Sequence, residues 1–396
     1  MIATSYPQLV QESLRQITGI LGEVPGVLSI LLLGSAARGE LAYAELDGRL
    51  EVFSDYEFLV VTRRRLPARE RQRVAERLAG LEREFGQRNP LFHIDVIFRE
   101  RHRLPTMPRI IFTYELKANG QVLHGEDVRP LLPEVTLANL DLRNTNEILI
   151  KRLWAILLHT PCRLLHGPLT HLEETVWGYV LCRNALDLTT VLLPHCGVLL
   201  PSYGERVKHM AKHYGQLGLA TRFGEEFPAF LIACLQERQS LHSSESLPYR
   251  YAKVINHVAA ALRFLCLFNE WPISRGEWAN LARLSLHYAK AGGPLAAGRW
   301  LRSPKKGVTA AGLLAMHRAL IAHQAGQDNE ATEQLVLSAR LLGRIAVAPL
   351  QPLEGNFAAR WLAQRRAWGD FWREYVRLGD PKYRQRFDFV TEWQDG

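Results

Sequence analysis

The chain has 396 residues, of which 47% are hydrophobic and 22% are charged, a composition typical of globular proteins and not of disordered ones. Lys and Arg number 49 against 40 Asp and Glu, and the resulting net charge of +9 suits a polyanionic ligand, although the excess is spread widely. The five cysteines include no Cys-x-x-Cys pair, which argues against a disulfide scaffold and against a compact zinc module.

Residues 1 to about 130 alternate between helical and strand-like patterns. The apolar run 27–33 ends at Gly34, as expected of a buried strand, and Pro67 opens an amphipathic helix. The remaining predicted elements are helices over 7–20 and 108–117 and strands over 51–61, 91–98 and 121–124. The sequence therefore predicts an α+β fold over residues 1–135, with a small mixed sheet and flanking helices.

From about residue 140 onward the strand-like alternation ends and amphipathic helices follow one another. Helices are predicted over 172–193, 248–268, 329–342 and 357–378. The last of these has an aromatic stripe (Phe357, Trp361, Trp368 and Trp372), which we interpret as helical packing. We expect a large all-α region made of a helical domain over 136–270 and a second helical domain or extension over 271–396.

No segment of the chain indicates export or membrane insertion. The beginning lacks a basic stretch followed by an apolar run, so we expect no signal peptide. The apolar segments are far shorter than the ~20 residues needed to span a bilayer. We therefore expect a cytoplasmic protein with no membrane partner.

Acidic residues interrupt two of the predicted strands. Asp55 and Glu57 share one face of the second strand, because side chains alternate across a strand, and Asp95 lies inside the third. Carboxylates placed side by side in apolar strands are unfavourable without a cation between them. If the two strands pair, the three carboxylates converge beside the Gly34-Ser35 turn, where backbone N–H groups and a hydroxyl can hold phosphate oxygens.

Such a constellation is what two-metal phosphoryl or nucleotidyl transfer requires, because hard oxygen ligands suit Mg²⁺ and a pair of cations stabilises the attacking and leaving oxygens. Three motifs carry a resemblance: Gly34-Ser35-x-x-Arg38-Gly39-Glu40, Ser54-Asp55-x-Glu57 and the separate Asp95. Together they resemble the polymerase-beta-type nucleotidyltransferase superfamily. The form of the first motif is most similar to its bacterial small-substrate branch, which includes aminoglycoside and minimal nucleotidyltransferases.

The resemblance implies a role for each matching position. Gly34 and Ser35 would bind the β- and γ-phosphates of a nucleoside triphosphate, and Arg38 would neutralise the departing pyrophosphate. The three carboxylates would hold two Mg²⁺ ions, with Asp95 also orienting or deprotonating the acceptor hydroxyl. This sequence departs from the usual pattern by having Glu57 where Asp is commoner, and by a long insert over 40–54 that we expect to form a hairpin or loop beside the site.

Other candidates have simpler interpretations beside the functional ones. His93 shares a strand face with Asp95, and we interpret it as a packed neutral histidine. Lys208 follows a predicted helix start, where the resemblance allows it to reach the triphosphate, although a surface position is the simpler interpretation. Arg183 and Asp187 are four residues apart on an apolar helix, which favours an intrahelical ion pair.

We expect a metal-dependent nucleotidyltransferase that moves a nucleoside monophosphate from a triphosphate to the hydroxyl of an acceptor, which we expect to be a small molecule, and releases pyrophosphate. Two alternatives remain open. One is a catalytically silent nucleotide-binding protein with a regulatory or scaffold role. The other is an RNA-directed nucleotidyltransferase, which the wide spread of positive charge does not favour.

Overall fold

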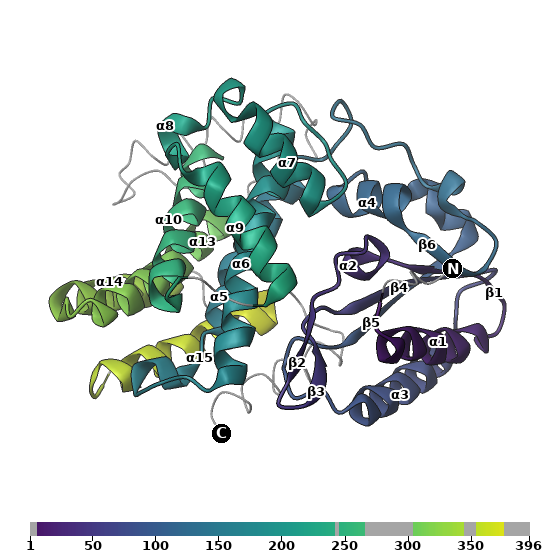
Figure 1. Cartoon of the computed structure of the whole chain (residues 1–396), viewed down its shortest axis with the longest axis horizontal. Helices are drawn as coiled ribbons and strands as arrows, with labels where there is room; N and C mark the ends of the chain where they lie inside the picture. The colour runs from purple at the N-terminus through teal and green to yellow at the C-terminus, as the bar shows by residue number, and fades with distance from the viewer. Residues whose placement is uncertain (1–5, 242–244, 266–303, 344–353, 376–396) are drawn as a thin grey trace. The chain divides into compact units, whose positions relative to one another are not determined.

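The structure is a computed structural model that describes residues 6–241, 245–265, 304–343 and 354–375 (Figure 1). The chain divides into two compact units. The sheet unit contains Met1–Asn144, Thr170–Gly218 and Glu226–Ser244, and the helical unit contains Thr145–Leu169, Leu219–Glu225 and Glu245–Gly396. The predicted α+β class is confirmed, because a mixed sheet with flanking helices precedes a largely helical region.

A four-stranded sheet forms the centre of the sheet unit, in the order β5-β4-β1-β6. The strands are β1 (Val27–Leu32), β4 (Tyr56–Thr62), β5 (Ile94–Glu100) and β6 (Gln121–Gly125). β1 is antiparallel to β4 and β6, whereas β4 and β5 are parallel. Parallel neighbours need a crossover, and α3 (Ala68–Phe85) provides it before ending at Gly86, which has the left-handed conformation common at helix ends.

Apolar side chains cover both faces of this sheet. One core contains Phe58 and Val60 and includes side chains of α1 (Gln8–Gly22) and α3. The other contains Leu59 and Val61 and includes Leu116 of α4 (Ile111–Asn119). One set of strand side chains therefore packs against α1 and α3, and the alternate set packs against α4, as the two-residue period of a strand requires.

The insert over 40–54 forms a separate hairpin, as predicted. Its strands are β2 (Tyr43–Leu46) and β3 (Arg49–Val52). Asp47 and Gly48 connect them with φ values of 53° and 73°, the two positive φ angles that a two-residue type I′ turn requires. The predicted single strand over 51–61 is wrong at residues 53–55, because the chain leaves the hairpin there before it enters β4.

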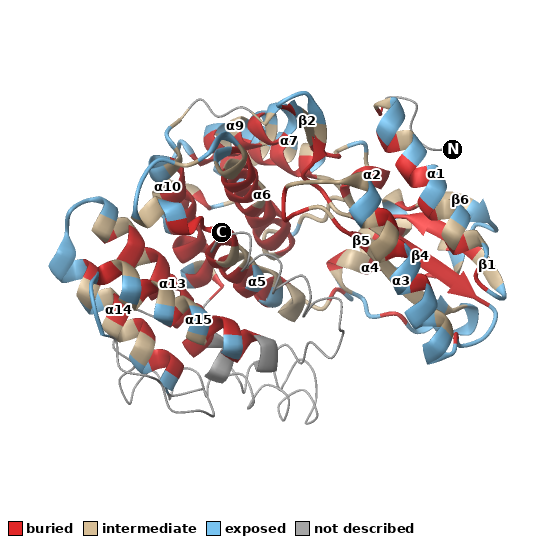
Figure 2. Cartoon of the chain, turned by 90° about the horizontal axis from the view of Figure 1, so that it is seen from below, coloured by how far each residue is buried: buried red, intermediate tan, exposed pale blue. Residues whose placement is uncertain are grey.

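Three longer helices complete the sheet unit: α6 (His171–His195), α7 (Tyr203–His213) and α9 (Phe227–Ser240), which pack on one another. α6 begins with a capping box, in which Thr170 and Glu173 satisfy each other's backbone N–H groups. Most of α6 is buried (Figure 2). A charged side chain on this helix therefore needs a specific partner.

The helical unit consists of α5 (Arg143–His159, from Thr145), α8 (Ala220–Phe223), α10 (Leu247–Phe264), α13 (Pro304–Gln324), α14 (Asp328–Gly343) and α15 (Phe357–Tyr375). Trp361 and Trp368 of α15 are fully buried, and Trp372 stacks on Trp154 with ring centroids 5.2 Å apart. These contacts confirm that the aromatic stripe is a packing surface.

Short 3₁₀ helices and one more α-helix complete the element list. The 3₁₀ helices are Arg101–Thr106, Arg129–Leu131, Cys162–Leu165 and Tyr214–Gln216, and α2 (Gly34–Ala37) is a single turn after β1. The predicted division at residues 270 and 271 lies outside the described residues and stays a prediction. Among the helices of the described ranges, none is both long and apolar enough to cross a bilayer.

Candidate active site

The Gly34-Ser35 turn lies directly beside β4. The N–H of Leu33 donates to the carbonyl of Glu57 at 2.8 Å, which holds the end of β1 against the start of β4. Gly34 has a φ of +62°, a conformation that glycine adopts without steric cost, and the buried Ser35 follows it in α2. The turn and β4 are thus joined at the backbone where the acidic residues occur.

The three carboxylates come together on the α4 side of the sheet. Glu57 lies opposite Asp95 in the parallel register of β4 and β5. Asp55 and Glu57 alternate with Tyr56 and Phe58, which lie in the core on the other face. We name Asp55, Glu57 and Asp95 the acidic cluster. The predicted alternation and strand pairing are both confirmed.

His93 joins two members of the acidic cluster. Its Nε2 lies 2.8 Å from Asp95 Oδ2 and 3.5 Å from Asp55 Oδ2, and one ligand atom from each residue lies within 4.8 Å of the others. The Nδ1 atom is 2.9 Å from the carbonyl oxygen of Leu91. The imidazole of His93 therefore contacts the carbonyl of Leu91 through one nitrogen and the carboxylates of Asp95 and Asp55 through the other.

The surroundings of Glu57 oppose the ionisation of its carboxyl group. Burial, followed by the charge of Asp55, raises the pKa of Glu57 to about 8. Asp95 acts in the same direction, while the guanidinium groups of Arg183 and Arg38 oppose the shift. Without a cation, Glu57 therefore keeps its proton at neutral pH, because a further negative charge here would be unfavourable.

The donor set fits a divalent cation. Asp55 and Asp95 place carboxylate oxygens within bridging distance of each other, and Glu57 adds a third carboxylate. These are hard oxygen ligands of the kind that Mg²⁺ and Mn²⁺ prefer, and His93 offers a nitrogen atom beside them. The residues present could therefore hold the predicted metal.

Arg183 has a different electrostatic partner from the one that its helix spacing indicated. Burial disfavours its charge, but Asp55 is the strongest of the acidic groups that hold the pKa of Arg183 well above its ordinary value, ahead of Asp187. Asp187 instead accepts a hydrogen bond from the Tyr203 hydroxyl at 2.7 Å. Helix α6 thus directs a positive charge toward the acidic cluster.

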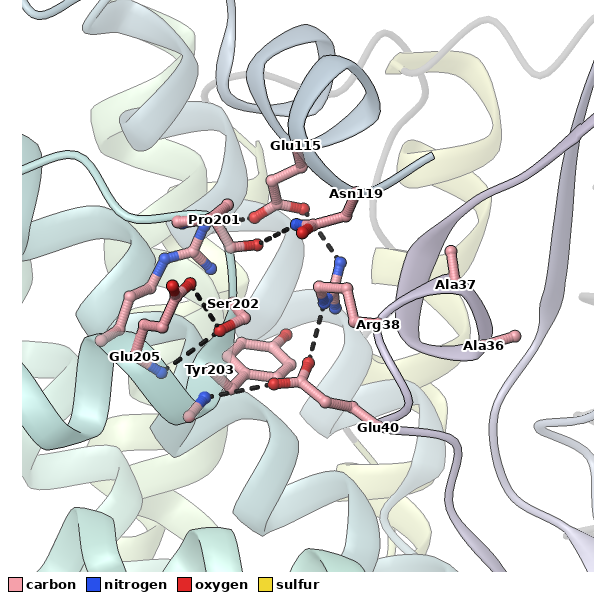
Figure 3. Close-up of polar contacts among 12 residues, drawn as sticks. Ala36, Ala37, Arg38, Glu40, Glu115, Asn119, Pro201, Ser202, Tyr203 and Glu205 are labelled. Carbon is pink, nitrogen blue, oxygen red and sulfur yellow. Dashed lines mark hydrogen bonds and ion pairs between the residues drawn. The ribbon is translucent and has the colours of Figure 1, made fainter. Parts of the chain in front are cut away.

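Arg38 is held by two carboxylates (Figure 3). Its Nε lies 2.8 Å from Glu40 Oε2, and its Nη1 lies 3.3 Å from Glu115 Oε2 of α4. Its guanidinium also lies over the Tyr203 ring, 5.5 Å from the centroid. Burial opposes the charge, but Glu115 and Glu40 raise the pKa of Arg38 above its usual range. Arg38 therefore connects the turn after β1 to α4 and α7.

The same network continues into α7. Arg206 forms an ion pair with Glu115 and donates to Thr190 Oγ1 at 2.8 Å, and the N–H of Gly204 donates to Glu40 Oε1 at 3.1 Å. Sequence reasoning did not identify Glu40 or Glu115 as partners of Arg38. The only signal was the position of Glu40 two residues later, because Glu115 is 77 residues away.

Lys208 is not brought to this network. It is exposed on α7, whereas Tyr203, Arg206, Val207 and Met210 form the buried side of the helix. The structure thus brings together the acidic cluster, the Gly34-Ser35 turn and Arg38, and leaves Lys208 on the outer side of α7.

These features define the site as an acidic, cation-compatible centre next to a glycine turn. No known family model matches the chain, and no curated protein is significantly similar to it. The resemblance to nucleotidyltransferases therefore depends on the residues and on the geometry described for them.

Proposed function

We propose that this protein is a Mg²⁺-dependent nucleotidyltransferase that transfers a nucleoside monophosphate from a triphosphate to the hydroxyl of a small acceptor and releases pyrophosphate. The observation that carries the proposal is the meeting of Asp55 and Asp95 oxygens within 4.8 Å, with Glu57 adjacent in register. An anion-accepting glycine turn is joined to the same strand. Neither feature alone is specific, but their combination suits phosphoryl chemistry.

In this proposal each residue has a distinct task. The acidic cluster holds the cations, which when bound neutralise the charge that develops on the transferring phosphoryl group. The backbone of Gly34 and Ser35 positions the β- and γ-phosphates. Asp95 accepts or orients the proton of the acceptor hydroxyl, and the 2.8 Å contact with His93 Nε2 fixes the direction of the Asp95 carboxylate. Catalysis then depends mainly on positioning and on charge stabilisation.

Pyrophosphate release tests the proposal. The full chain is incubated with Mg²⁺, each common nucleoside triphosphate and a panel of hydroxylated small molecules. We expect release that depends on an acceptor and is reduced about 10–100-fold in the Asp55→Asn and Asp95→Asn variants, because each removes a negative charge from the metal site. Asp127→Asn is the matched control, since Asp127 is in a surface ion pair with Arg129.

The remaining outcomes separate the alternatives. Tight triphosphate binding without turnover across the panel would indicate a silent nucleotide-binding protein. Turnover only with an RNA acceptor would indicate the RNA-directed enzyme. Equal turnover in the wild type and in both cluster variants would refute a catalytic role for the acidic cluster.

A further inference from the structure

A dense group of arginines follows β4, far from the acidic cluster. Between residues 63 and 77 the sequence has seven arginines and two glutamates, a surplus of five positive charges out of the chain's +9. All seven arginine side chains are exposed. We name them the arginine patch: Arg63, Arg64, Arg65, Arg69, Arg71, Arg73 and Arg77. The positive charge is therefore less evenly distributed than composition indicated.

Most of the arginine patch has no acidic partner. Arg77 is paired with Glu23 at 2.6 Å. For the other six arginines, no ion pair is formed with any carboxylate in the described ranges. These six exposed guanidinium groups give this stretch a local surplus of positive charge that an anionic ligand can neutralise.

The arginines are presented on fixed backbone. The N–H of Arg63 donates to the carbonyl of Gly26 at 2.9 Å, and Thr62 Oγ1 donates to the carbonyl of Arg64 at 2.8 Å. Leu66, directly after the three arginines, is buried in the core shared with α1 and α3. Since the turn is anchored at both ends, little ordering of the backbone is needed when a ligand binds.

The spacing along α3 suits a ligand with regularly repeated charge. Arg69, Arg73 and Arg77 are each four residues apart, so they follow one another at about 6 Å along one side of the helix. Arginine also binds phosphate oxygens through two parallel hydrogen bonds, which lysine cannot do.

The composition of the patch favours a nucleic acid over other anionic partners. Membrane-bound helices insert apolar side chains beside their basic ones, but the large exposed hydrophobic residues of the described ranges (Leu9, Leu137, Ile232 and Tyr249) all lie elsewhere in the sequence. Protein-interface hot spots combine arginine with Trp or Tyr, and residues 63–77 contain no aromatic residue. A nucleic-acid backbone needs none, because its phosphates supply most of the affinity.

We propose that the arginine patch is a docking surface for the phosphate backbone of a nucleic acid. Arg63, Arg64 and Arg65 and the acidic cluster lie at opposite ends of β4, about 20 Å apart along the strand. Binding at the patch is therefore separable from chemistry at the cluster. Nucleic-acid binding at the patch is a reason to include an RNA end among the acceptors when transferase activity is tested.

The salt dependence of binding measures this surface directly. Fluorescence anisotropy of the full chain with a labelled 20-nucleotide RNA, without Mg²⁺ or nucleotide, gives the dissociation constant at several salt concentrations. If all six unpaired arginines contact phosphates, the logarithmic slope is about −4, and affinity falls about 300-fold between 50 and 200 mM salt. DNA of the same sequence shows whether the ribose contributes.

Two triple variants distinguish the effect of the arginine patch from the effect of the protein's net charge. Replacing Arg63, Arg64 and Arg65 by Gln should weaken binding and make the slope shallower by about 2. The control replaces Arg15, Arg101 and Arg103 by Gln, which removes the same charge from exposed residues that are already in ion pairs. Circular dichroism checks that both variants fold.

Three results would overturn the proposal: a slope near zero, equal weakening in the two triple variants, or tighter binding to vesicles rich in anionic lipid than to RNA. The assay contains no Mg²⁺ or nucleotide, so its outcome is independent of transferase activity. Failure of the proposed function would leave the RNA measurement unchanged.

Discussion

Replacing Gly34 by alanine tests the link between the glycine turn and the acidic cluster. A Cβ atom at Gly34 would lie 1.9 Å from Glu57 Oε2, whereas ordinary contact begins at 3.4 Å, so the carboxylate would have to retreat by about 1.5 Å. The φ of +62° adds a backbone cost of about 1–2 kcal/mol for a residue with a Cβ. Because the contact is with the end of a flexible side chain, we expect the Gly34→Ala variant to fold with a displaced Glu57.

Gly39 provides the matched control. Its φ is +73°, and nothing lies within 4 Å of the Cβ position. Gly39→Ala should therefore lose a similar 1–2 kcal/mol of unfolding free energy without moving a carboxylate. Only Gly34→Ala should weaken cation binding, by about tenfold or more, since displacing a group that supports a metal site typically costs 10–100-fold in affinity.

Two measurements on each variant decide the question. Urea unfolding gives the change in stability, and calorimetric titration with Mn²⁺ gives the affinity of the site. Glu57→Gln should match Gly34→Ala in cation affinity while keeping wild-type backbone. If the two glycine variants bind Mn²⁺ equally well, the contact between the turn and Glu57 does not control the metal site.

Three further predictions concern stability. Burial lowers the pKa of His317 to about 4, so mainly the unfolded chain gains a proton as pH falls from 6.5 to 4. The free energy of unfolding should therefore drop by about 3 kcal/mol over this pH range. Urea unfolding at several pH values should show a correspondingly smaller drop for the His317→Gln variant. Gly312→Ala places a Cβ 2.2 Å from Cζ2 of the buried Trp368, so thermal unfolding should reveal a loss of about 1–3 kcal/mol, and an unchanged midpoint would contradict the packing. Thr170→Ala removes the capping box of α6 and should cost about 1 kcal/mol in urea unfolding, whereas Thr170→Ser should retain most of it.

The main features of the acidic cluster follow from local sequence pattern. A strand has a period of two, so Glu57 lies on the face opposite to Tyr56 and Phe58 once β4 forms, and Asp55 directly precedes the strand. The hairpin was also predictable, because Asp47-Gly48 lies between short strand-like segments and readily adopts two positive φ angles. His93 was placed correctly on the face of Asp95, but its contact with two carboxylates depends on how β5 lies beside β4.

Partner choice among charged residues was not predictable in the same way. The i,i+4 spacing of Arg183 and Asp187 favoured a local ion pair, yet Asp55 is the stronger electrostatic partner of Arg183. Electrostatic interactions depend on distance and burial, and both are set by packing. The i,i+4 spacing predicts which charged groups can pair within one helix. It does not predict which groups on other elements lie closer after folding.

By itself the sequence determined the elements that repeat a local period and the acidic positions that those periods align. Only the tertiary structure decided that Arg38 is bound between Glu40 and Glu115, and that helices α6, α7 and α9 lie in the same compact unit as the sheet. The physical reason is range. Alternation and helical periodicity act between neighbours in the chain, whereas burial and ion pairing act between surfaces that only folding brings together.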